Sequence, residues 1–176
     1  MSNAFDCLNH RLLLGKLEAY GFDTDSIRLM SSYFKDRFNR LKIGETTSSW
    51  KCVKNRYPQV SSFGPLLWNL FQNDLTFVMR SVSMFAEDHH FCEIDKFVST
   101  IQAKLQDSKA TSWYESNSLK GNYGKYGSVL MSRVNKLKDH KLKLHVNGTD
   151  IKSYDSITLL RVDIDNALNF SGLSYR

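Results

Sequence analysis

The sequence predicts a single α+β domain, residues 1–176, in which helices pack on one face of an antiparallel sheet. Several segments carry apolar residues at helical spacing, and others alternate in polarity between turn residues. The expected order is two helices, a hairpin, a helix, a second hairpin, a helix and further strands. A chain of 176 residues with 41% hydrophobic content suffices for one real core.

Two helices are expected in the first forty residues. The first ends at Gly21, and the second is capped by Thr24 or Asp25. The apolar positions of the first are Leu13, Leu14, Leu17 and Tyr20. The apolar face of the second is Ile27, Met30, Phe34 and Phe38. A hairpin in residues 40–54 around Gly44 follows.

The middle of the chain predicts a helix and a second hairpin. Pro65 suits the first turn of a helix, whose apolar stripe continues through residues 66–71. In "SVSMFAEDHHF", the side chains of Val82, Met84 and Ala86 alternate with those of Ser83 and Phe85. This strand reaches its tip at Glu87-Asp88.

The last third predicts a helix over residues 95–115, then strands. Val98, Ile101 and Leu105 form the inward face of the helix. "GSVLMS" is strand-like, and "KLKLHVNGTDIK" is a hairpin around Asn147-Gly148. "SITLLRVDID" completes the strands.

The bulk properties predict an intracellular protein, nuclear or cytoplasmic, that is neither secreted nor membrane-bound. The N-terminus is not a signal peptide, and the uncharged run 57–73 is too polar for a membrane span. Cys7, Cys52 and Cys92 are far apart and indicate reduced thiols. The net charge of +6 suits a polyanionic partner, either nucleic acid or an acidic membrane surface.

The acidic pair Glu87-Asp88 has two interpretations. Adjacent carboxylates at a strand tip are a known way to hold Mg²⁺, which prefers oxygen ligands. An acidic pair in a turn is more commonly only solvated, so the spacing alone leaves both open.

Four motifs in order resemble the reverse transcriptases of non-LTR (LINE-type) retrotransposons. "SNAFDCLNHRLLLGKLEAYGF" is similar to DLSKAFDxVxHxxLLxKLxxYG, and "PQVSSFGPLLWNLFQNDL" with "MFAEDHHF" is similar to GxPQGSxLGPLLFNLYINDL with YADD. "WYESNSLKGNYGKYGSVLMS" is similar to WxxxNxLxLNxxKTxxMxFS, and "ITLLRVDIDNALNF" to YLGVxLDxxLxF.

The resemblance implies a palm-like antiparallel sheet that performs RNA-directed DNA synthesis. An RNA template, a DNA primer and deoxynucleotides would be its partners, and two Mg²⁺ ions, or Mn²⁺, its cofactors. By this resemblance Glu87 and Asp88 are the metal-binding, catalytic acids of YADD, and Phe85 is its aromatic residue.

Four further positions carry over from the resemblance. Phe5 matches the bulky side chain that excludes a ribonucleotide 2′-hydroxyl. Pro58 and Gln59 match the loop that contacts the incoming nucleotide and the template. Lys125 matches a catalytic lysine near the leaving pyrophosphate. Plain packing for Phe5 and Pro58, and a solvated Lys125, are the alternatives.

The departures from the family pattern predict an inactive copy. The aspartate that opens the first motif would precede Met1, and Asp6 lies too far along the strand to replace it. Glu87 stands for an aspartate, and Val60 and Arg161 stand for glycines. Fingers and thumb are expected to be largely missing.

Other interpretations remain. The first is a non-catalytic nucleic-acid-binding remnant with basic clusters at Lys51, Lys54 and Arg56 and at Lys136, Lys138, Lys141 and Lys143, against the alternative of a solvated face. The second takes Asp88-His89-His90 as a DHH phosphoesterase signature, or the histidines with Cys92 as metal ligands. A third is a chain that lacks a central strand and does not fold stably.

Overall fold

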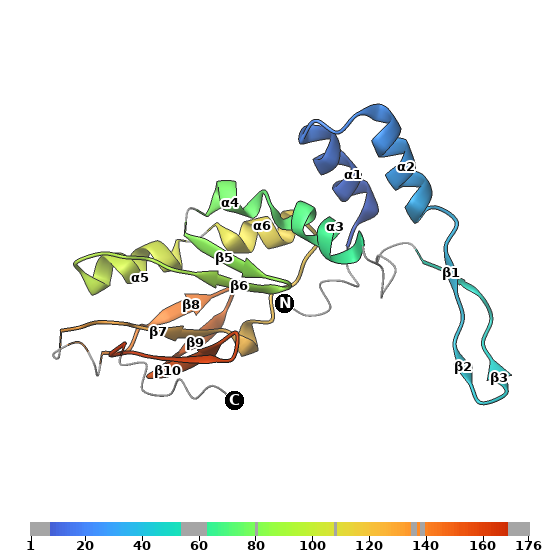
Figure 1. The fold of residues 1–176 in the computed structure, drawn as a ribbon. Helices are drawn as coiled ribbons and strands as arrows, with labels where there is room; N and C mark the ends of the chain where they lie inside the picture. Colours follow the sequence, from blue (N-terminus) through green and yellow to red (C-terminus); the bar gives the residue numbers. More distant parts are fainter. Residues whose placement is uncertain are drawn as a thin grey trace. The chain divides into compact units, whose positions relative to one another are not determined.

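The computed structural model describes residues 8–53, 63–79, 81–107, 109–134, 137 and 140–168 (Figure 1). The chain divides into two compact units. Unit 1 is Met1–Phe91 with Lys109–Gly121, and unit 2 is Cys92–Ser108 with Asn122–Arg176. Both contain helices and small, mainly antiparallel sheets, which confirms the α+β class.

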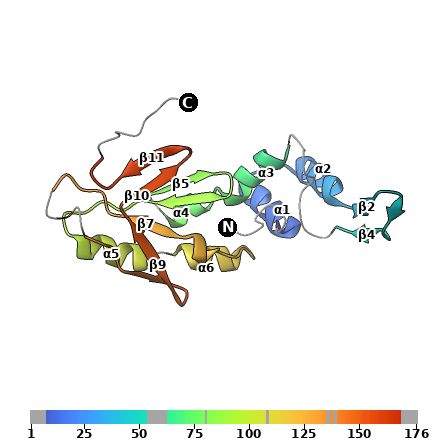
Figure 2. The same ribbon diagram turned by 90° about the horizontal axis from the view of Figure 1, so that it is seen from below.

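Unit 1 combines a helical core with two hairpins. Its helices are α1 (His10–Ala19), α2 (Thr24–Phe34), α3 (Phe63–Gln72), α4 (Leu75–Val78) and α6 (Ala110–Ser116). Its strands are β1 (Phe38–Asn39), β2 (Lys42–Ile43), β3 (Thr46–Thr47), β4 (Lys51–Cys52), β5 (Val82–Phe85) and β6 (Asp88–Phe91). The helices α4 and α6 cover one face of the β5–β6 hairpin (Figures 1 and 2).

The first two helices form as predicted, with corrections at α2. The side chain of Asn9 caps α1, and Gly21 follows it with φ +87°. Asp23, one residue earlier than predicted, caps α2. Phe38 is not in this helix: it lies exposed in β1, because the chain leaves the helical path and passes through Asp36 with φ +53°.

Side chains from α1, α2, α3, α4 and α6, together with Leu8 just before α1, contribute to the core of unit 1. The largest fully buried ones are Leu8, Leu13, Leu17, Trp68, Phe71 and Leu75. Val82, Met84 and Phe91 of the β5–β6 hairpin pack against them. Burying each large apolar side chain contributes about 1.5–3 kcal/mol, so this core holds the hairpin in place.

Unit 2 packs one helix against a three-stranded sheet. Its elements are α5 (Val98–Gln106), the 3₁₀ helix η2 (Tyr123–Lys125), β7 (Gly127–Val129), β8 (Leu144–Val146), β9 (Thr149–Tyr154), β10 (Ser156–Leu159) and β11 (Val162–Asp165). The sheet order is β7-β9-β8, with β7 parallel to β9, and β10 pairs with β11 (Figure 2). The predicted inward residues of α5, namely Val98, Ile101 and Leu105, pack on this core.

Two predicted features of the architecture differ from the structure. The expected helix 95–115 is two helices, because α5 packs in unit 2 whereas α6 packs in unit 1. The polar segment between them, with Asp107 at the end of α5, favours a turn. The prediction of a single sheet is also wrong for the described strands, which form separate sheets of two or three strands.

The β10–β11 turn is strained at a position where the resemblance has glycine. Leu160 and Arg161 have φ of +49° and +68°, a conformation that costs non-glycine residues roughly 1–2 kcal/mol. The β8–β9 turn also has two consecutive positive φ angles, +47° and +80°, but it has Asn147 and Gly148 there, which tolerate this conformation better.

We expect Arg161→Gly to raise the free energy of unfolding of unit 2 by about 1 kcal/mol, because glycine removes the clash of Cβ at positive φ. Urea denaturation followed by circular dichroism measures the change. Arg161→Ala is the matched control, since it removes the charge and keeps Cβ. An equal gain from alanine would contradict the strain.

Candidate metal-binding turn

The predicted acidic turn closes the β5–β6 hairpin. Phe85 pairs with Asp88, so Ala86 and Glu87 form the two-residue turn. The tip therefore lies one residue earlier than predicted, and Asp88 begins β6. Ala86 has φ +49°, which such tight hairpin turns require.

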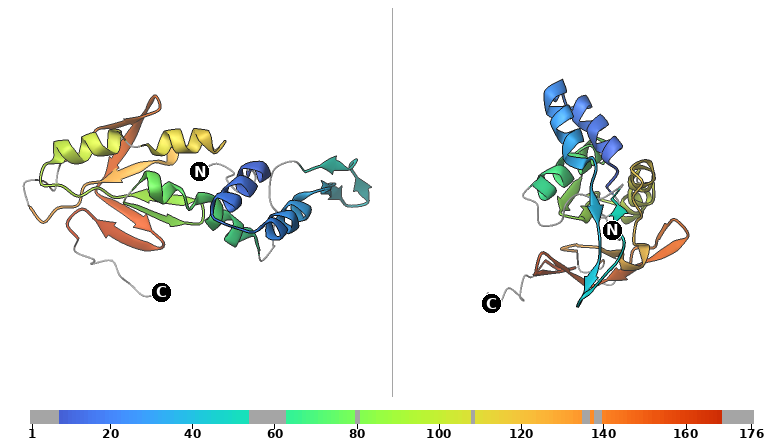
Figure 3. Two further views of the ribbon diagram at one scale, coloured as in Figure 1. Left: turned by 90° about the horizontal axis from the view of Figure 1, so that it is seen from above. Right: turned by 90° about the vertical axis from the view of Figure 1, so that its right-hand side faces the viewer.

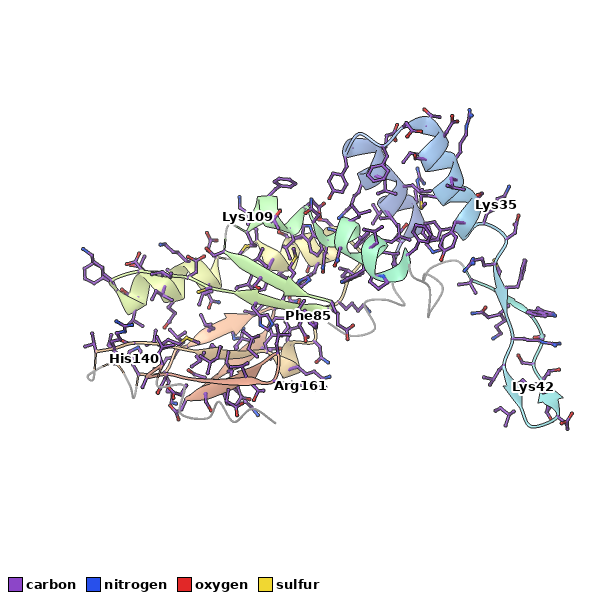
Figure 4. All side chains as sticks on the ribbon, viewed as in Figure 1. Lys35, Lys42, Phe85, Lys109, His140 and Arg161 are labelled. Atoms are coloured by element: carbon purple, nitrogen blue, oxygen red, sulfur yellow. The ribbon has the colours of Figure 1, made fainter. Side chains whose placement is uncertain are left out.

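The predicted alternation is confirmed for Val82–Phe85, but not for Ala86, which was expected on the face of Val82 and Met84 and lies exposed in the turn. Val82 and Met84 are half-buried against the core of unit 1, whereas Ser83 and Phe85 are exposed. Phe85 lies at the end of β5 that leads into the turn (Figure 4). Asp88, its direct partner across the strands, is exposed as well, and Glu87 is half-buried.

A tryptophan of α3 holds the turn. The Nε1–H of Trp68 donates a hydrogen bond of 2.6 Å to the carbonyl oxygen of Ala86. The side chain is 1% exposed, so its position is set by packing in the core. The local sequence does not indicate this role, because Trp68 is one apolar residue among several in the helical stripe.

Behind the turn, His89 lies in a buried polar network. Its Nδ1 is 2.9 Å from the hydroxyl of Tyr114, and its Nε2 is 2.9 Å from Oε1 of Gln72. Burial lowers the pKa of His89 to about 4, with nearby His90 acting in the same direction and Asp88 opposing. Because both ring nitrogens already have hydrogen-bonding partners in the protein, the role of His89 here is structural.

A second polar network joins α1, α6 and the segment before α4. Lys16 Nζ donates to the Asp74 carboxylate at 2.8 Å and to the Phe71 carbonyl oxygen at 2.7 Å. Trp113 Nε1 donates to the same Asp74 oxygen at 3.0 Å. Burial lowers the pKa of Lys16, although the Asp74 carboxylate opposes this shift. The network fixes the helices on which the hairpin rests.

Of the other predicted site residues, only Lys125 lies in the part of the chain that the structure describes. Lys125 is exposed in η2 of unit 2. Phe5, Pro58 and Gln59 lie outside the described residues.

Glu87 and Asp88 can offer a divalent cation two carboxylates, which are suitable ligands for Mg²⁺ or Mn²⁺. Within the described ranges, no group of three or more His, Cys, Asp or Glu side chains could hold a metal ion. A cation held by these two side chains alone would keep water at most of its coordination positions.

Comparison with protein-family models gives no match, and no curated protein matches the chain. None of the helices in the described part of the chain is both long and apolar enough to span a membrane.

Proposed function

We propose that the chain is part of a reverse transcriptase domain of the non-LTR retrotransposon type, with the β5–β6 turn as its metal-binding turn. The ancestral activity is RNA-directed DNA synthesis from a DNA primer on an RNA template. The four motifs in order support this proposal.

One observation carries the proposal beyond the motifs. The resemblance covers both "PLLWNLF" and "FAED", which are separated in sequence, and the Trp68–Ala86 hydrogen bond joins them. The core that buries Trp68 thereby fixes the backbone of the two acids. The positive φ of Arg161, where the family pattern has glycine, supports the match at the C-terminal end.

We further propose that this copy does not polymerise. A bound divalent cation would supply positive charge for phosphoryl transfer. Glu87 carries one methylene more than the aspartate of the family pattern, which moves its carboxylate by about 1 Å, whereas Mg²⁺ demands ligands at 2.0–2.1 Å in near-octahedral geometry. Misplacement on this scale costs about a hundredfold in rate.

Manganese binding tests the assignment of the turn. We expect Mn²⁺ at millimolar concentration to broaden the amide NMR signals of residues 86–89 selectively, because a paramagnetic ion acts on nuclei close to it. Glu87→Asp should lower the concentration required, since the shorter side chain restores the family geometry.

Asp88→Asn is the matched control, because it keeps the shape and removes the charge. We expect it to abolish the selective broadening. Broadening that is unchanged in Asp88→Asn, or that is spread evenly over acidic residues, would contradict the assignment.

A further inference from the structure

The segment 37–53, the basic hairpin, is a surface that the turn chemistry does not use. Its inner pairs are Lys42 with Thr47 and Ile43 with Thr46, and its outer pairs are Phe38 with Cys52 and Asn39 with Lys51. Gly44, with φ +58°, allows the tip to turn. Figure 3 shows this hairpin as a narrow two-stranded ribbon.

Residues 38–52 are all exposed. Four of them are large apolar side chains: Phe38 is 52% exposed, Leu41 64%, Ile43 71% and Trp50 61%. A two-stranded hairpin without a buried face is at best marginally stable in water, and clustered exposed apolar groups mark an interaction surface. The hairpin therefore has the properties of a binding element.

Its charge indicates the partner. The hairpin contains four cationic residues, Arg37, Arg40, Lys42 and Lys51, and one acidic residue, Glu45. Its net charge is therefore +3, which is half of the +6 of the whole chain. Within the described residues none of the four cations forms an ion pair. This charge opposes pairing with a second copy and favours a polyanion.

An aromatic platform lies among these cations. The guanidinium of Arg40 lies over the Trp50 ring at 4.8 Å from its centre, and that of Arg37 lies over Tyr33 at the same distance. Cations that contact phosphates, with an exposed aromatic ring on which a base stacks, are the combination that binds single-stranded nucleic acid.

We propose that the basic hairpin binds single-stranded nucleic acid, with a base stacked on Trp50 and phosphates contacted by Arg37, Arg40, Lys42 and Lys51. This surface is separate from the acidic turn, so the inference holds or fails independently of cation binding there. The expected ligand is an unpaired strand, because a base within a duplex is already stacked on its neighbours.

Tryptophan fluorescence of the full chain tests the proposal. The chain has three tryptophans, of which Trp68 and Trp113 are 1% and 6% exposed, so Trp50 is the one accessible to a base. We expect oligo(dT) and oligo(rU) to quench the emission, and Trp50→Phe to remove that quenching and keep binding within about threefold. Trp50→Ala should weaken binding by about tenfold, in keeping with the loss of one stacked base.

Charge variants locate the site. We expect the triple change Arg40→Ala, Lys42→Ala and Lys51→Ala to weaken binding at least tenfold. The slope of the logarithm of the binding constant against the logarithm of the salt concentration should become shallower by about 2, because each phosphate contact contributes about 0.7. The control, Lys96→Ala, Lys120→Ala and Lys152→Ala, removes three exposed lysines that lie outside the basic hairpin and outside the other basic cluster of the sequence.

Equal losses from the two triple variants would overturn the proposal, because binding would then follow net charge alone. Quenching by heparin or anionic vesicles with none by the oligonucleotides would also overturn it, in favour of a different polyanion. All altered side chains are exposed, and circular dichroism checks that each variant keeps its fold.

Discussion

Replacing Trp68 with alanine should lower the free energy of unfolding of unit 1 by about 3–5 kcal/mol. The side chain is 1% exposed, and its loss leaves a cavity beside Phe71, whose ring is stacked at 5.8 Å. The change also removes the donor to the Ala86 carbonyl. Urea denaturation followed by circular dichroism measures the loss.

Two variants separate these contributions. Trp68→Phe keeps most of the apolar volume and removes the N–H group, so we expect a loss of about 1–2 kcal/mol and faster amide exchange at Glu87 and Asp88. Trp50→Ala, an equal change at an exposed site, should stay within about 0.5 kcal/mol of the parent chain. Similar losses at Trp50 and Trp68 would show that the core is not organised as described.

Acid should destabilise unit 1 through His89. Its pKa is about 4 in the folded protein, against 6.5 for the unfolded chain. Between these values the unfolded state binds more protons, so stability is greatest above pH 6.5 and falls as the pH drops towards 4. Allowing for partial solvent access, we expect the loss to reach about 2–3 kcal/mol.

The change His89→Gln tests this linkage. Glutamine keeps hydrogen-bonding capacity toward Gln72 and Tyr114 and does not titrate. The free energy of unfolding is measured from pH 4 to pH 7 for both proteins. We expect the parent chain to lose more stability towards pH 4 than the variant, and the difference should equal the loss assigned to His89. Parallel curves for the two proteins would contradict a buried, neutral His89.

The sequence predicts well what depends on nearby residues. Gly21 ends α1, and Asn147-Gly148 forms a hairpin turn, because each conformation is favoured by the residues at that position. Alternation alone predicts the position of the acidic turn to within one residue. Periodicity failed at Phe38, where an apolar residue continued the helical spacing beyond the end of α2.

The supports of the turn could not be predicted, because they depend on contacts between distant segments. Trp68 contacts a carbonyl eighteen residues later, and His89 has partners seventeen and twenty-five residues away. Each is an ordinary residue in its local pattern. The break between α5 and α6 has the same origin, since it depends on two cores that periodicity does not distinguish.

Primer extension tests the central claim most directly. The chain, Asp88→Ala and Glu87→Asp are compared on an RNA template with a DNA primer and Mg²⁺ or Mn²⁺. We predict no extension by the chain above the level of Asp88→Ala. Extension that disappears in Asp88→Ala would contradict the proposed inactivity and show a working turn, and extension that persists in Asp88→Ala would contradict the assignment of the turn itself.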